Sequence, residues 1–196
     1  MADRVEEYLT KNGVWLRSRE NAILVTPDDV RASVQKTRTA IDLQYFVGTA
    51  KHESNFAINE RDTESDGFET WGIYQVSSPE AMRAGLAKVS DALKLDECTR
   101  VMVYLAENLR FQIRKFLKLP DSAPDPVGIE AYIAIGHNQG LGQAKTTGKG
   151  LLGTLFRYGL DWPRYVANNP HLNIVAHGYG NDVLPLHSPL RKAVKK

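Results

Sequence analysis

A glutamate at the end of an apolar helix face is the first candidate for chemistry in this chain of 196 residues. Glu53 follows Phe46 by seven residues and Ala50 by three, which places its carboxylate on the apolar face of a predicted helix, in the last turn. A helix C-terminus carries partial negative charge and apolar neighbours exclude water, so both disfavour the ionised carboxylate. Such a group suits general acid catalysis. The alternative is a glutamate that lies in solvent just past the helix end.

The elements that must position Glu53 are mostly helices. Thr26-Pro27-Asp28-Asp29 is typical of a helix start, because threonine can cap and proline suits the first helical position, so we expect a helix to about residue 37. The next helix begins near Ala40 and carries Glu53. Helical patterns also cover residues 2–11, 78–87, 96–118, 126–135, 151–158 and 163–167. With a short β-hairpin between Ala57 and Val76, the sequence predicts a mainly α fold.

The composition limits the classes of protein that this chain can belong to. Apolar residues make up 42%, charged residues 24%, and the mean hydropathy is −0.35, as in ordinary globular domains. A formal charge of +2 does not indicate a nucleic-acid partner. The single cysteine, Cys98, excludes an intrachain disulfide, which suits a reducing compartment. We expect no membrane span, because no apolar run reaches about 18 residues.

Metal and cofactor sites are not predicted. Neither His52-Glu53 nor the other histidines show the spacing of ligands on one helix, and position 56 is Phe56 where a zinc-protease helix needs a second histidine. The remaining histidines are His137, His171, His177 and His187. We therefore expect no cofactor.

Four segments occur in an order that chance explains poorly. Glu53-Ser54-x-Phe56 is followed by Gly72-Ile73-Tyr74-Gln75, then by Gly136-His137-Asn138-Gln139-Gly140, and finally by Pro163-Arg164-Tyr165-Val166. This arrangement resembles the lysozyme-like domain of soluble lytic transglycosylases and the related goose-type lysozymes. The resemblance spans about residues 40–167. It implies an α+β lysozyme-like fold, in which a helical domain and a short hairpin or irregular loop flank a sugar-binding groove.

The resemblance assigns a role to each matching position. Glu53 takes the place of the catalytic acid, and Ser54 the place of a serine that supports the helix end. His137 stands where the family has a tyrosine, and a histidine there can hydrogen-bond the acid. The other expected substrate-binding residues are Gly72, Ile73, Tyr74 (where the family has methionine), Gln75, Asn138 and the late aromatic Tyr165.

The activity that follows is cleavage of peptidoglycan glycan strands. A lytic transglycosylase breaks the β-1,4 bond between N-acetylmuramic acid and N-acetylglucosamine with one glutamate as acid and then base. The 6-hydroxyl of the substrate attacks C1 and leaves a 1,6-anhydro-muramyl end. The sequence favours this reaction with Glu53, because a second catalytic carboxylate is not evident.

Other functions stay open at this point. A hydrolysing muramidase would use Glu53 with Asp66, which lies thirteen residues after Glu53, as in goose-type lysozymes, although Ser65-Asp66-Gly67 is also good turn chemistry. A chitinase-like or chitosanase-like hydrolase could use the same fold. A non-catalytic wall-binding or structural protein could also keep it.

The domain organisation and cellular setting follow the same resemblance. We expect one lysozyme-like domain over residues 1–196, with a helical extension at 1–39, the catalytic core at 40–167 and an irregular tail at 168–196. The expected partner is peptidoglycan, bound by a monomer. The charged N-terminus, Met1-Ala2-Asp3-Arg4, lacks the apolar segment of a secretory signal. The expected route is therefore synthesis in the cytoplasm, then release or delivery as a phage endolysin, a virion lysozyme or a secreted effector.

Overall fold

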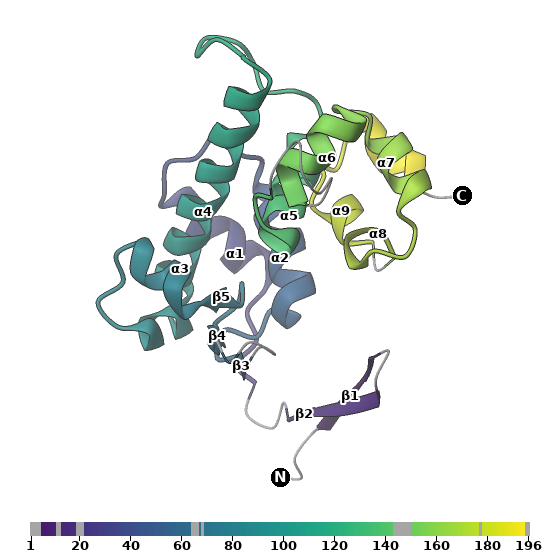
Figure 1. Ribbon diagram of the computed structural model, residues 1–196. Helices are drawn as coiled ribbons and strands as arrows, with labels where there is room; N and C mark the ends of the chain where they lie inside the picture. The colour runs from purple at the N-terminus through teal and green to yellow at the C-terminus, as the bar shows by residue number, and fades with distance from the viewer. Residues whose placement is uncertain are drawn as a thin grey trace.

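The fold is mainly helical, as the sequence predicts, with a small three-stranded antiparallel sheet, β3 to β5, beside the helices (Figure 1). The computed structural model describes residues 5–10, 13–18, 22–63, 67, 69–142, 150–176 and 178–194. The helices are α1 (Pro27–Gln35), α2 (Leu43–Ser54), α3 (Ser78–Arg83), α4 (Leu95–Phe116), α5 (Ile129–Gln139), α6 (Gly150–Tyr158), α7 (Trp162–Asn168), α8 (Asn173–Ala176) and α9 (Tyr179–Asp182), with 3₁₀ helices η1 (Val89–Leu93) and η2 (Pro189–Val194). The strands are β1 (Val5–Thr10), β2 (Gly13–Ser18), β3 (Arg61–Thr63), β4 (Glu69–Trp71) and β5 (Val76–Ser77).

Capping residues set the helix ends that matter for the site. Helix α1 begins with a capping box, in which Thr26 and Asp29 exchange side-chain and backbone hydrogen bonds, as its sequence predicts. Ser77 and Glu80 form the same motif at the start of α3. Helix α2 ends at Asn55, whose left-handed conformation (φ 49°) turns the chain directly after Glu53 and Ser54.

Helix α5 forms the centre of the molecule. Its residues from Ile129 to Gly136 are all buried, and it packs against α4, α6 and α9 (Figure 1). A helix that is apolar on every side belongs in a core. Helix α2 packs against α1 and α9, so the end of α2 lies close to the centre of the fold.

Three parts of the chain differ from the sequence prediction. Residues 5–10 form strand β1, paired antiparallel with β2 so that Val5 faces Ser18 and Thr10 faces Gly13, where a helix over 2–11 was expected. The spacing of Val5, Tyr8 and Leu9 fits a helix, but valine, tyrosine and threonine favour strands, and so short a segment leaves periodicity ambiguous. The N-terminal region therefore contributes a hairpin and α1 in place of a purely helical extension.

The glycine-rich segment and the tail also differ. Helix α5 runs through Gly136, His137 and Asn138 to Gln139, because Gly136 allows close packing against Leu109 of α4. The expected irregular tail instead contains α8, α9 and η2, and α9 packs on α2. Gly180 permits this path, since a Cβ there would lie 2.4 Å from the indole ring of Trp162.

None of the described helices combines the length and apolar character that crossing a membrane requires.

Candidate functional site

Glu53 lies in the last turn of α2, as the sequence predicts, and its side chain is 23% exposed. The neighbouring Ser54 is buried, and its hydroxyl donates hydrogen bonds to the carbonyl oxygens of Ile73 (2.9 Å) and Ala50 (3.3 Å). The bond to Ile73 joins the end of α2 to the turn between β4 and β5. Two of the predicted motif segments therefore meet through a single hydrogen bond.

The turn from Gly72 to Gln75 holds its shape through its own side chains. Gln75 donates from Nε2 to the carbonyl of Gly72 (2.8 Å) and accepts from the hydroxyl of Thr70 (3.0 Å). Gly72 has φ 74°, and a Cβ there would lie 2.0 Å from the carbonyl oxygen of Ala92. The turn is therefore packed directly on η1, and glycine is required for that contact.

The side chains of Ile73 and Tyr74 are fully buried in the core. They cannot touch a sugar in this conformation, so their expected role as substrate contacts gives way to a supporting one beneath the turn. Ser54 is 1% exposed and likewise supports the site from below.

His137 comes to Glu53 from the last turn of α5. Its Nε2 atom lies 3.6 Å from Oε1 of Glu53, and the His137 side chain is only 9% exposed. The two residues are 84 positions apart in sequence, and α2 and α5 bring them together. The distance of 3.6 Å is longer than a hydrogen bond, so the two side chains must move slightly closer before a proton can pass between them. When the ring is protonated, the two groups form an ion pair.

The far side of α2 is tied to α9. Asp182 of α9 accepts from Lys51 Nζ (2.7 Å), and its Oδ2 lies 2.9 Å from His52 Nε2. His52 also stacks on Tyr179, with ring centroids 4.8 Å apart. Gly48 allows the close approach, since a Cβ there would lie 2.7 Å from the backbone of Asp182.

The net effect of these contacts is a lowered pKa at Asp182. Burial by itself raises the pKa of this carboxyl group, but the hydrogen bonds from Lys51 and His52 outweigh it and hold the pKa below its ordinary value of 3.8. Asp182 therefore stays ionised and anchors two residues of the helix turn that presents Glu53.

Two buried tyrosines, Tyr45 and Tyr179, lie within electrostatic reach of Glu53. Burial raises the pKa of Tyr179 well above its ordinary value, and the charge of Glu53 raises it further. Burial likewise raises the pKa of Tyr45, and the charges of Glu53 and Glu80 add to that. Both hydroxyl groups are therefore neutral. Neither makes a hydrogen bond of ordinary geometry within the described part of the chain, although Thr49 lies near both.

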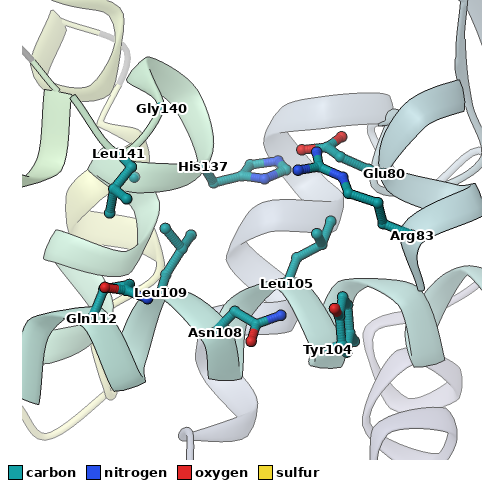
Figure 2. Close-up of a pocket in the computed structure, with 11 residues that line it drawn as sticks. Glu80, Arg83, Tyr104, Leu105, Asn108, Leu109, Gln112, His137, Gly140 and Leu141 are labelled. Carbon is teal, nitrogen blue, oxygen red and sulfur yellow. The ribbon is translucent and has the colours of Figure 1, made fainter.

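A cavity of about 440 Å³ opens beside His137. Its walls come from α3, α4 and the end of α5 (Figure 2). Figure 2 shows the His137 ring extending from α5 toward Glu80 and Arg83, which reach in from α3. Tyr104, Asn108 and Gln112, spaced four residues apart on α4, form the opposite wall. The cavity thus combines carboxylate, guanidinium, imidazole, amide and aromatic groups with the apolar side chains of Leu105, Leu109 and Leu141, which suits a ligand that has both hydroxyl groups and apolar faces.

The other predicted residues have separate positions. Asn138 is exposed beside His137, and Tyr165 is buried, where its hydroxyl accepts a hydrogen bond from Gln139 (3.3 Å) and its ring stacks on Trp162. Tyr165 of α7 therefore holds the C-terminal end of α5 through its hydrogen bond with Gln139. Asp66, the expected second carboxylate of a muramidase, lies outside the described residues.

Sequence reasoning missed Glu80 and Tyr179. The segment Ser77-Ser78-Pro79-Glu80 is so typical of a helix start that it suggests no further role for the glutamate. Tyr179 lies in a segment expected to be irregular, and only the packing of α9 on α2 brings it to Glu53. No signal in the local sequence marks either one as part of a site.

The described residues hold no group of three or more histidine, cysteine, aspartate or glutamate side chains that could bind a metal ion.

Comparison of the chain with protein-family models, with curated proteins and with solved structures found no match. The resemblance to lytic transglycosylases and goose-type lysozymes therefore stays a prediction from motifs. Any function must be argued from the site itself.

Proposed function

We propose that this protein cleaves the glycan strands of peptidoglycan at the β-1,4 bond between N-acetylmuramic acid and N-acetylglucosamine, with Glu53 as the general acid. The observation that carries the proposal is the pairing of Glu53 with His137, which itself lines a cavity of mixed polar and apolar character. A surface glutamate would have neither a partly buried carboxyl group nor a titratable partner from another helix. The order of the four motif segments along the chain supports the same activity.

The first step of the reaction needs only Glu53. Its carboxyl group gives a proton to the glycosidic oxygen while the bond from that oxygen to C1 breaks, which releases the N-acetylglucosamine hydroxyl and leaves a cation-like centre at C1. Ser54 and Asp182 hold the helix turn on either side, so that the carboxyl group keeps its position as the bond breaks. His137 then lies within reach to exchange a proton with Glu53 and restore it.

Two second steps are compatible with this acid. In lytic transglycosylation, which the sequence favours, the 6-hydroxyl of the muramic acid attacks C1 and returns its proton to Glu53. In hydrolysis, water attacks C1 and a second carboxylate takes the proton. The products differ, because the first reaction leaves 1,6-anhydro ends and the second leaves reducing ends.

The proposal is tested by Glu53→Gln, which keeps the shape and removes the acid. We expect turbidity clearing of purified peptidoglycan to fall by about 1,000-fold or more, since a required proton donor contributes roughly 10²–10⁴-fold and is needed here for bond cleavage. The matched control is Glu97→Gln, which removes an exposed carboxylate of α4 that pairs with Arg100. Full clearing by Glu53→Gln would contradict the proposal.

The same pair of variants also separates an enzyme from a wall-binding protein. A non-catalytic protein would bind sedimented peptidoglycan equally with and without Glu53, and the wild type would release no soluble fragments. Release of fragments by the wild type and by Glu97→Gln, with none from Glu53→Gln, supports the catalytic role.

A further inference from the structure

The two oxygens of the Glu80 carboxylate have different surroundings. Oε2 accepts hydrogen bonds from the backbone N–H of Ser77 (2.9 Å) and from its hydroxyl (2.7 Å). Within the described residues, Oε1 has no hydrogen bond and no ion pair. The side chain is half-buried in the wall of the cavity that His137 also lines. The capping box thus fixes one oxygen of a side chain that lines the cavity (Figure 2).

Glu80 and Glu53 are linked through the same histidine. His137 contacts Glu53 and, together with Glu80, lines the cavity. Burial raises the pKa of the Tyr45 hydroxyl, and the charges of Glu53 and Glu80 raise it further, so both carboxylates lie within electrostatic reach of this residue. Water-dependent glycoside cleavage requires a second carboxyl group besides the acid, and Glu80 is the carboxyl group that the cavity wall supplies among the described residues.

We propose that Glu80 is the second catalytic carboxylate, and that this protein is a hydrolase leaving reducing muramyl ends; the inference rests on the proposed role of Glu53. As the bond from C1 to the glycosidic oxygen breaks and Glu53 donates its proton, a water molecule held at the free oxygen of Glu80 attacks C1. The water gives one proton to Glu80, and its oxygen becomes the new C1 hydroxyl. Glu53 is left ionised and Glu80 protonated, and transfer of that proton through His137 or solvent restores both.

A purely structural role for Glu80 makes a different prediction. Capping needs one oxygen that accepts from Ser77, and glutamine at this position of a capping box supplies it as well as glutamate does. Glu80→Gln therefore keeps the helix start and removes the base. If Glu80 only caps α3, this substitution leaves activity unchanged.

The experiment digests purified peptidoglycan with the full-length wild type, Glu80→Gln, Glu80→Asp, Glu53→Gln and the control Glu97→Gln. Borohydride reduction followed by mass spectrometry identifies the ends, because reducing muramyl ends gain hydrogen and 1,6-anhydro ends do not. We expect reducing ends from the wild type and from Glu97→Gln, and a loss of about 100-fold or more in Glu80→Gln. Thermal unfolding of Glu80→Gln should match the wild type, and Glu80→Asp should recover part of the rate.

Each other outcome overturns a defined part of the argument. Anhydro ends from the wild type, or a Glu80→Gln rate equal to the wild-type rate, overturn the role of Glu80 and leave Glu53 as the acid of a transglycosylase. A large loss of thermal stability in Glu80→Gln, with recovery of neither rate nor stability in Glu80→Asp, assigns the residue to the cap. Full activity of Glu53→Gln overturns the proposed function and this inference together.

Discussion

The two sides of Glu53 are built differently. On the supported side, formed by the turn 72–75 and α9, every contact is short: Ser54 donates to Ile73, Lys51 donates to Asp182, and Gly48 and Gly72 allow backbones to touch. On the open side, formed by the cavity wall of α3, α4 and α5, polar side chains face a space of about 440 Å³.

This difference teaches how the chain can fix the carboxyl group of Glu53, the proposed acid, and still leave it partly exposed. Close packing on the supported side does not block the approach of a ligand from the open side. The polar groups of the open side remain available to contact that ligand. Substitutions on the supported side should therefore reduce stability and activity together. Substitutions on the open side should reduce activity and leave stability nearly unchanged.

The largest effect is expected at Gly72, on the supported side. Gly72→Ala adds a Cβ at φ 74° that would lie 2.0 Å from the carbonyl oxygen of Ala92, so the turn must move away from η1. We expect a loss of about 3 kcal/mol or more in the free energy of unfolding, from backbone strain and overpacking combined. Chemical denaturation measures it.

Gly85→Ala is the matched control, because Gly85 has φ 80° and open space around its Cβ position. It should cost about 1 kcal/mol, which is the strain alone. Equal losses in the two variants would show that the turn does not pack on η1 as described. Wall clearing should fall in Gly72→Ala and persist in Gly85→Ala.

The second effect in size is expected at His137, on the open side. His137→Gln keeps a polar side chain and removes the titratable ring that lies 3.6 Å from Glu53. We expect the rate of glycan cleavage to fall by about 10- to 100-fold, since proton exchange with Glu53 is impaired. The melting temperature should change by no more than about 2 °C, because glutamine fills most of the volume of the largely buried ring.

The control for this substitution is His171→Gln, which changes an exposed histidine of the segment between α7 and α8. Its rate should equal that of the wild type. If His137→Gln lost stability in proportion to activity, His137 would belong to the supported side. The contrast between the supported side and the open side would then be weaker.

The sequence was sufficient for the helix ends and insufficient for the partners of Glu53. Thr26, Pro27 and Asp29 specify the start of α1 through local hydrogen bonds, and apolar spacing puts Glu53 in the last turn of α2, so both could be predicted. Tyr179 and Asp182 reach α2 only because Gly48 lets two backbones touch, a contact between residues far apart in the chain. Local patterns carry no information about such contacts.

Glu80 illustrates a second limit of sequence reasoning. A capping box is a sufficient local explanation for a glutamate at position 80, so the sequence gives no reason to expect a second role for its carboxylate. The place of Glu80 in the cavity wall depends on where α3 packs against α4, which is set by the whole fold. The buried Ile73 and Tyr74 show the reverse case, since motif position suggested substrate contact and packing placed both in the core.

A smaller effect, dependent on pH, is expected at Asp182 on the supported side. The lowered pKa of Asp182 means that its interactions contribute fully above its unfolded value of about 3.8 and are lost as pH falls through the folded value. At neutral pH, Asp182→Asn should cost about 1 kcal/mol, because half-exposed Lys51 is screened by solvent and the more buried His52 contributes most.

The measurement compares melting temperatures of Asp182→Asn and the wild type from pH 7 down to pH 3. The difference should begin to shrink as pH falls below about 4, since the carboxylate is then protonated in the unfolded chain, and it should be lost as pH falls through the lower pKa of the folded state. A difference that stayed constant over this range would mean that the charge of Asp182 does not hold α9 on α2.

The smallest effect is expected at Tyr104, on the cavity wall of α4. Its ring is 46% exposed and lies one turn before Asn108, so a sugar ring in the cavity can rest on the aromatic face while the amide hydrogen-bonds its hydroxyl groups. Tyr104→Ala should raise KM for soluble glycan chains about fivefold, equivalent to about 1 kcal/mol, with little change in kcat.

Phe111→Ala is the matched control. It removes an aromatic side chain that is 59% exposed on the same helix but does not line the cavity, and the KM of this variant should equal that of the wild type. Because both rings are exposed, neither substitution should alter stability by more than about 0.5 kcal/mol. An equal rise in KM for both variants would mean that α4 binds glycan along its whole outer face, and the open side would then extend beyond the cavity.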